Sequence, residues 1–136
     1  MSNLAALLPQ CQEIPLANPG VYLLIRGGEV IYVGRSRDVG PRIAGHAARG
    51  RIKFDRAVYL PLPLADLAKY EGALYRVFLP SECGHGAPNR GDAEVLARFG
   101  LAATPPEAVK AHEHARRVNA RVERNACRNA RRRETA

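Results

Sequence analysis

Residues 20–35 read GVYLLIRGGEVIYVGR, and this stretch decides the fold. Two apolar runs, residues 21–25 and 30–33, flank Gly27-Gly28, a pair that tolerates the positive φ angles of a tight turn. Apolar runs joined in this way predict an antiparallel β-hairpin. The two ends of a hairpin lie side by side, so side chains near both ends can share one face of the sheet.

Helix-capping and chain-breaking residues predict the elements that follow the hairpin. Asp38 is a suitable N-cap for a helix over residues 39–48 that ends at Gly50. A third strand is expected over residues 54–60. Apolar residues then recur at helical spacing over residues 64–79, which predicts a second helix.

Two more helices are expected in the last third of the chain. One covers residues 92–99, and the other begins with Thr104 as N-cap and Glu107 completing a capping box. The predicted order is β-β-α-β-α followed by helices, which belongs to the α+β class.

The chain is strongly basic. Its 136 residues carry 21 Lys and Arg against 13 Asp and Glu, a formal net charge of +8. At this length we expect one domain with a modest core. A protein with such an excess of positive charge usually binds a polyanion, above all nucleic acid. A basic surface that only aids solubility is the alternative.

Cysteine usage and hydropathy bear on the compartment. The three cysteines are odd in number and widely spaced, which fits a reducing cytoplasm better than a disulfide framework. The N-terminus has neither the early positive charge nor the apolar run of a secretory leader. No stretch approaches the roughly 18 consecutive apolar residues of a membrane span. We therefore expect a cytoplasmic protein that does not interact with membranes.

Two tyrosines near the ends of the hairpin are the first candidate functional residues. Tyr22 in Gly20-Val21-Tyr22 and Tyr32 in Tyr32-Val33-Gly34 can place two phenol hydroxyls on one face of the sheet. Tyrosines also pair across strands for packing alone. The pair by itself therefore does not decide between a structural and a functional role.

Cationic residues follow the second tyrosine. Arg35 ends the hairpin, and Arg42 and His46 lie one turn apart on the next predicted helix, where i, i+4 spacing gives them a common face. Beside two tyrosines they suit a phosphodiester, because Arg42 can stabilise the charge that builds up in the transition state. Ordinary surface positions are the alternative for Arg42 and His46.

Two residues further along complete the candidate set. Glu71 lies in the helix predicted over residues 64–79. Its carboxylate can bind a hard cation such as Mg²⁺, with water in the other coordination positions, or it can simply face solvent. Asn89 follows Pro88 in a glycine-rich loop, as a polar anchor or as an ordinary turn residue.

Taken together and in this order, these residues resemble the GIY-YIG nuclease family. The resemblance covers residues 19–90 and rests on Gly20-Val21-Tyr22, Tyr32-Val33-Gly34-Arg35, Arg42, His46, Glu71 and Pro88-Asn89. Both tripeptides carry valine in place of isoleucine, a change that matters little in a strand. The resemblance implies a small three-stranded antiparallel sheet flanked by helices, and a reaction that uses one divalent ion, Mg²⁺ or Mn²⁺.

The resemblance also implies a role for each residue. Glu71 would be the only protein ligand of the metal, and Arg42 would bind the scissile phosphate. Tyr22 would accept the proton of the attacking water, with support from Tyr32. A tyrosine has a pKa of about 10, so nearby cations would have to lower it. Three further residues would complete the phosphate pocket and fix the loop geometry: Arg35, His46 and Asn89.

The C-terminal residues carry much of the positive charge. Residues 105–136 hold nine Lys and Arg against four Glu, which is +5 of the net +8. Four arginines recur at a spacing of four, three and four, and so form one stripe on a helix: Arg117, Arg121, Arg124 and Arg128. The stripe predicts a phosphate-binding helix. A solvated charged tail is the alternative.

We therefore expect an N-terminal segment (1–17), a catalytic core (18–90) and an arginine-rich helical extension (91–136). The predicted activity is metal-dependent endonucleolytic hydrolysis of DNA. A non-catalytic module that binds DNA or RNA on the same fold is the alternative. Few residues follow the core, so we expect either weak sequence specificity or specificity that comes from a homodimer or from a separate partner.

Overall fold

The structure is a computed structural model that describes residues 2–13, 18–83 and 93–135. It divides into two compact units, Met1–Thr104 and Pro105–Ala136, which are described one at a time. The boundary expected after residue 90 lies outside the described residues. The helix that follows it, α4 (Ala93–Phe99), belongs to the first unit.

The first unit is built on an antiparallel sheet with the strand order β1-β4-β2-β3. Strands β2 (Gly20–Arg26) and β3 (Glu29–Ser36) form the predicted hairpin. Strand β4 (Arg56–Pro61) pairs with the other edge of β2, which completes the expected three antiparallel strands. The sequence did not predict β1 (Gln12–Glu13), a two-residue strand that pairs with β4.

The turn and the register of the hairpin set the geometry of the site. Gly27 and Gly28 have φ angles of 59° and 77°, the left-handed conformation for which glycine is the favoured residue. In the register of β2 against β3, Tyr22 lies opposite Gly34, and Leu24 lies opposite Tyr32. Because side chains alternate along a strand, Tyr22 and Tyr32 lie on the same face of the sheet.

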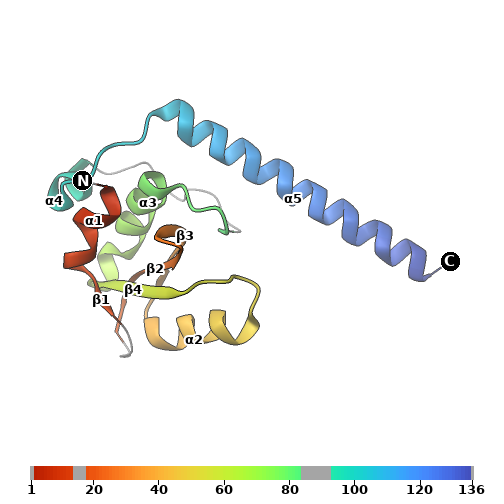
Figure 1. Ribbon diagram of the computed structural model, residues 1–136, viewed down its shortest axis with the longest axis horizontal. Coiled ribbons are helices and arrows are strands. Elements are labelled where there is room, and N and C mark those ends of the chain that lie inside the picture. The colour runs from red at the N-terminus through yellow and green to blue at the C-terminus, as the bar shows by residue number, and fades with distance from the viewer. Residues whose placement is uncertain (1, 14–17, 84–92, 136) are drawn as a thin grey trace. The chain divides into compact units, whose positions relative to one another are not determined.

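Helices cover both faces of this sheet (Figure 1). Helix α2 (Val39–Arg49) lies on one face, and α1 (Asn3–Leu7) and α3 (Leu67–Phe78) lie on the other. Single 3₁₀ turns, η1 (Leu8–Gln10) and η2 (Leu64–Asp66), follow α1 and precede α3.

Each face has its own apolar cluster. On the side of α1 and α3, the β2 residues Val21 and Leu23 pack in a large aliphatic core. On the side of α2, Tyr22 and Leu24 belong to a smaller cluster rich in tyrosine. The candidate catalytic residues of the hairpin therefore lie on the α2 side.

Of the two predicted N-caps, Asp38 is confirmed as the N-cap of α2, and Thr104 as the N-cap of α5 is wrong. Helix α2 ends at Gly50 with a φ of 65°, but Asp38 makes no side-chain capping bond; the Ser36 hydroxyl accepts from the Asp38 amide instead (3.0 Å). Helix α5 has Pro105, not Thr104, as its N-cap. The Thr104 hydroxyl donates to the Val77 carbonyl near the end of α3 (3.3 Å), where helical carbonyls lack internal partners.

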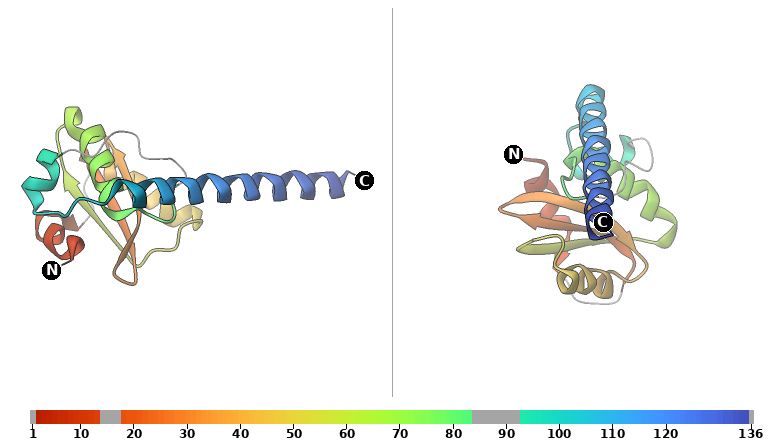
Figure 2. Two further views of the ribbon diagram at one scale, coloured as in Figure 1. Left: turned by 90° about the horizontal axis from the view of Figure 1, so that it is seen from above. Right: turned by 90° about the vertical axis from the view of Figure 1, so that its right-hand side faces the viewer.

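The second unit is a single continuous helix, α5 (Pro106–Glu134), of 29 residues (Figure 2). Its last turn is closed by the Thr135 hydroxyl, which donates to the carbonyls of Arg131 and Arg132 (3.2 Å each). Within the described ranges, no helix is both long and apolar enough to cross a lipid bilayer.

Candidate active site

The two tyrosines of the hairpin stack on each other beside a glycine. The ring centroids of Tyr22 and Tyr32 are 5.8 Å apart, with an angle of 21° between the ring planes. Gly34 lies against both rings: a Cβ atom there would be 2.6 Å from Cζ of Tyr22 and 2.8 Å from Cε1 of Tyr32. Gly34 is therefore required for the rings to lie across β3 at this distance.

Helix α2 brings an imidazole and a guanidinium to the tyrosines. Oη of Tyr22 lies 2.9 Å from Nε2 of His46, which is buried (7% exposed). Arg42, one turn earlier and exposed, forms a hydrogen bond with the Tyr22 hydroxyl. A guanidinium only donates, so the Tyr22 oxygen accepts from Arg42.

The direction of the contact between Tyr22 and His46 depends on the tautomer of His46. With the proton on Nδ1, Nε2 accepts from Tyr22, and the chain of donors runs from Arg42 to Tyr22 to His46. With the proton on Nε2, His46 donates to Tyr22, and Nδ1 can accept from Arg49, whose Nη2 lies 3.5 Å away.

Burial sets the protonation states of these groups. Burial raises the pKa of Tyr22, and the neighbouring Tyr32 raises it further; the hydrogen bond from Arg42 opposes this rise but does not overcome it. Burial also lowers the pKa of His46 below 6.5, with help from the positive charges of Arg49 and Arg42. At neutral pH the phenol is protonated and the imidazole is neutral. The pKa of Tyr22 is therefore raised, whereas the nearby cations were expected to lower it.

Glu71 is a buried carboxylate and does not face solvent. It lies in α3 with 6% of its surface exposed, and its Oε2 atom is 3.8 Å from Nε of Arg35. A buried carboxylate is a hard oxygen donor suited to Mg²⁺ or Mn²⁺. In the part of the chain that the structure describes, no group of three or more His, Cys, Asp or Glu forms a metal cage. An ion at Glu71 would draw its other ligands from water and phosphate.

Tyr32 connects the two parts of the site. Burial is the main reason why the pKa of Tyr32 is raised, and the charges of Glu71 and Arg42 also act on it, in opposite directions. The edge of Tyr32 packs on the His46 ring, with centroids 4.7 Å apart. Six of the seven predicted catalytic residues thus lie in one connected neighbourhood: Tyr22, Tyr32, Arg35, Arg42, His46 and Glu71. The seventh, Asn89, lies outside the described residues.

Three more residues belong to the same cluster and were not predicted: Tyr59, Tyr75 and Cys83. Tyr59 on β4 lies opposite Tyr22 in the sheet, and its hydroxyl accepts from Asn18 Nδ2 (3.4 Å). The pairing of β4 with β2 that places Tyr59 opposite Tyr22 could not be predicted from the sequence. The sequence did contain a signal for Tyr75, since this residue lies four positions after Glu71 on the same helix.

Cys83 closes the free edge of β3. Its Sγ atom lies 3.4 Å from both the amide and the carbonyl of Val33, and the Glu82 amide donates to the Ile31 carbonyl (2.8 Å). Glu82 and Cys83 thus supply hydrogen-bond partners to the outer edge of β3, on the side away from β2. A lone cysteine in a loop carries no sequence signal for this role.

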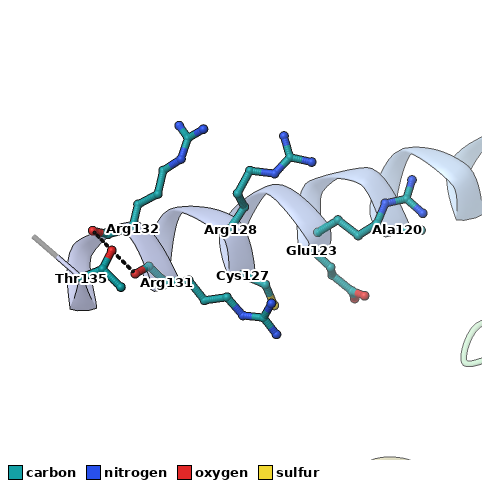
Figure 3. A pocket seen from close by; sticks show the side chains of 8 residues that line it. Ala120, Glu123, Cys127, Arg128, Arg131, Arg132 and Thr135 are labelled. Atoms are coloured by element: carbon teal, nitrogen blue, oxygen red, sulfur yellow. Dashed lines mark hydrogen bonds between the residues drawn. The ribbon is translucent and has the colours of Figure 1, made fainter.

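The predicted arginine stripe lies on α5, and all four of its members are exposed: Arg117, Arg121, Arg124 and Arg128. Figure 3 shows that Arg132 projects from the same side of the helix as Arg128. The stripe therefore continues one turn further than the sequence analysis placed it, by the same i, i+4 spacing. Arg131 and Cys127 project from a different side of this surface (Figure 3).

Comparison of the chain with protein families, with curated proteins and with solved structures found no significant match.

Proposed function

We propose that this protein is a metal-dependent endonuclease that hydrolyses DNA phosphodiester bonds in the manner of the GIY-YIG nucleases. The observation that carries the proposal is the hydrogen-bonded chain of Arg42, Tyr22 and neutral His46. Tyr32 lies on the same face of the sheet, where the charges of Glu71 and Arg42 act on it. The buried Glu71, paired with the exposed Arg35, completes the set. Activation of water, binding of phosphate and binding of metal each have a residue suited to them.

Tyr22 and His46 together provide a base that Tyr22 alone does not. The raised pKa of Tyr22 makes a free phenolate rare at neutral pH. A relay avoids that species: in the tautomer of His46 with the proton on Nδ1, water gives a proton to Oη of Tyr22 while Tyr22 passes its own proton to Nε2 of His46. The water oxygen forms the new bond to phosphorus, and the bond to the leaving 3′ oxygen breaks. At the end of this step His46 is an imidazolium beside Tyr22.

The cations and the carboxylate act on the phosphate. Arg42 is exposed, so it can donate to a non-bridging oxygen of the scissile phosphate while it remains beside Tyr22. Arg35 supplies a second guanidinium near Glu71. Glu71 would hold one Mg²⁺ or Mn²⁺, which when bound supplies charge stabilisation for the leaving oxygen.

Helix α5 supports DNA as the substrate. Its 29 residues span about 44 Å, the rise of roughly 13 base pairs of duplex, and carry nine Lys and Arg against four Glu. A helix with exposed arginines on one side can bind the phosphate backbone without reading sequence. A homodimer or a separate partner would then supply any specificity. RNA is the alternative polyanion.

One observation favours a second candidate, a module that binds nucleic acid without cutting it. Because the pKa of Tyr22 is raised, Tyr22 seldom forms the phenolate that would act as a base at neutral pH. The two candidates differ in one respect: the binding module needs neither Glu71 nor a divalent ion.

Plasmid cleavage separates the two. Full-length protein is incubated with supercoiled plasmid and Mg²⁺ or Mn²⁺, with EDTA as control. The enzyme should convert the plasmid to nicked and linear forms only with metal. Glu71→Gln should lower the rate by more than about 100-fold while DNA binding, measured by fluorescence anisotropy, is retained.

The matched control is Glu29→Gln, which removes an exposed carboxylate at the opposite end of β3. This variant should cut at the rate of the unaltered protein. If Glu71→Gln and the unaltered protein behave alike, the nuclease proposal is wrong. Binding without metal-dependent cleavage in the unaltered protein would establish the second candidate.

A further inference from the structure

A cavity opens where β3 ends and the η2–α3 segment begins. It has a volume of about 350 Å³ and, among the described residues, is lined by Arg35, Arg37, Leu64 and Leu67. The two arginines come from the end of the hairpin, and the two leucines come from the start of the helix that carries Glu71. Two cationic and two apolar side chains therefore meet across elements that are distant in sequence.

The lining selects an amphiphilic anion. Two guanidinium groups in one cavity call for a phosphate or carboxylate group. Leu64 is 56% exposed, an unusual setting for a large apolar side chain beside two arginines. A ligand with a phosphate at one end and a flat, weakly polar ring at the other satisfies both features. The cavity lies at the lower end of the range for small-molecule sites, roughly 300–1,000 Å³, which suits one nucleotide.

Arg35 places this cavity next to the candidate active site. It lines the cavity and lies 3.8 Å from the Glu71 carboxylate. Arg42, the residue assigned to the scissile phosphate, comes from a different element, α2. Because Arg35 lines the cavity and lies beside the proposed metal ligand Glu71, the cavity is suited to the nucleotide next to the bond that is cut.

We propose that the cavity lined by Arg35, Arg37, Leu64 and Leu67 is a subsite for the nucleotide that flanks the scissile phosphate. The guanidinium of Arg37 binds the phosphate of that nucleotide, and Leu64 contacts its base. This inference rests on the proposed nuclease function, and it adds an anchor that fixes the strand on one side of the cut.

The test is a titration of ¹⁵N-labelled full-length protein, followed by NMR. The probes are thymidine 3′,5′-bisphosphate, inorganic phosphate and thymidine. The bisphosphate should shift the amide signals of Arg37, Leu64 and Leu67, and should bind at least about 10-fold more tightly than phosphate. Thymidine alone should not bind, since charge-assisted hydrogen bonds provide most of the affinity.

Two variants test the lining. Arg37→Ala should weaken bisphosphate binding by at least about 10-fold, the loss of one charged hydrogen bond, and Leu64→Ser should weaken it about 3- to 10-fold. Both residues are exposed, so the fold should persist, which circular dichroism checks. Arg51→Ala, an exposed arginine after α2, is the control and should bind as the unaltered protein does.

The outcomes separate this inference from the nuclease proposal. The subsite is refuted if the shifts fall on other residues, if Arg37→Ala binds like Arg51→Ala, or if phosphate binds as tightly as the bisphosphate. If the bisphosphate binds as expected but the protein does not cut plasmid with either metal, the subsite stands and the nuclease proposal fails.

Discussion

The hydroxyl of Tyr22 on β2 and Nε2 of His46 on α2 lie 2.9 Å apart, both within the buried side of the sheet. This contact joins a phenol whose pKa is raised to an imidazole whose pKa is lowered. Each group is in its neutral form at pH 7, so a proton can move along the hydrogen bond without a charge being buried beforehand.

The rate of DNA cleavage should fall as pH decreases below 6.5. Only neutral His46 accepts the proton that Tyr22 passes on, and burial with the nearby arginines lowers the pKa of His46 below its usual 6.5. Activity is therefore full above that pKa and is lost as pH falls through it. The measurement is plasmid nicking from pH 4.5 to 8. His46→Gln should be slower by about 10²- to 10⁴-fold and should lose this acid limb.

The same residue should make stability depend on pH. Unfolded His46 takes up a proton near pH 6.5, whereas the folded protein resists protonation until a lower pH. The unfolded state thus binds more protons than the folded state below pH 6.5. The free energy of unfolding therefore decreases as the pH is lowered, by at most about 1.4 kcal/mol per pH unit. Urea titrations at several pH values measure the slope. His46→Gln should flatten it between pH 6.5 and 5, and an unchanged slope would contradict the assignment.

Tyr22→Phe isolates the hydroxyl. The ring stays in its stack with Tyr32, but the relay between water and His46 loses its middle member. We expect cleavage to slow by about 10²- to 10⁴-fold, with DNA affinity nearly unchanged. Tyr59→Phe is the matched control, because its hydroxyl accepts from Asn18 and takes no part in the relay. Equal losses in the two variants would mean that the phenols serve packing.

Gly34→Ala should damage both the fold and the site. The added Cβ would lie 2.6 Å from Cζ of Tyr22, a distance that forces the stacked rings or β3 to move. Overpacking of this kind typically costs about 1–3 kcal/mol of unfolding free energy. Thermal melts should show the loss. Gly45→Ala is the control, since a Cβ there meets nothing closer than the flexible end of Arg49, at 3.5 Å.

Local sequence signals were sufficient for the hairpin, α2 and the spacing of the main candidates. The Gly27-Gly28 turn predicts the hairpin, but a register shift between Leu24 and Ile25 is what brings Leu24 opposite Tyr32 and puts Tyr22 and Tyr32 on one face. The i, i+4 rule aligns Arg42 with His46. The hairpin and this alignment each need only a few consecutive residues, which explains why they agree with the structure, whereas the register shift has no such local signal.

Properties that depend on distant segments could not be predicted. Whether Glu71 faces solvent depends on how α3 packs on the sheet, and the structure buries it against Arg35. The direction of the Tyr22 pKa shift depends on the balance between burial and Arg42, and residue types alone do not set that balance. Tyr59 and Cys83 pack in the cluster beside the site only through the pairing of β4 and of the β3 edge.

The arginine stripe of α5 should determine how DNA affinity depends on salt. Changing Arg117, Arg121, Arg124 and Arg128 to Gln removes four exposed cations from one side of the helix. If each contacts one phosphate, the slope of log affinity against log salt concentration should become shallower by about 3.6. Changing the same four residues to Lys keeps the charge and should leave the slope nearly unchanged. Fluorescence anisotropy with a labelled duplex between 50 and 300 mM KCl measures both variants. A Gln variant with the original slope would show that these four arginines do not contact the DNA phosphates.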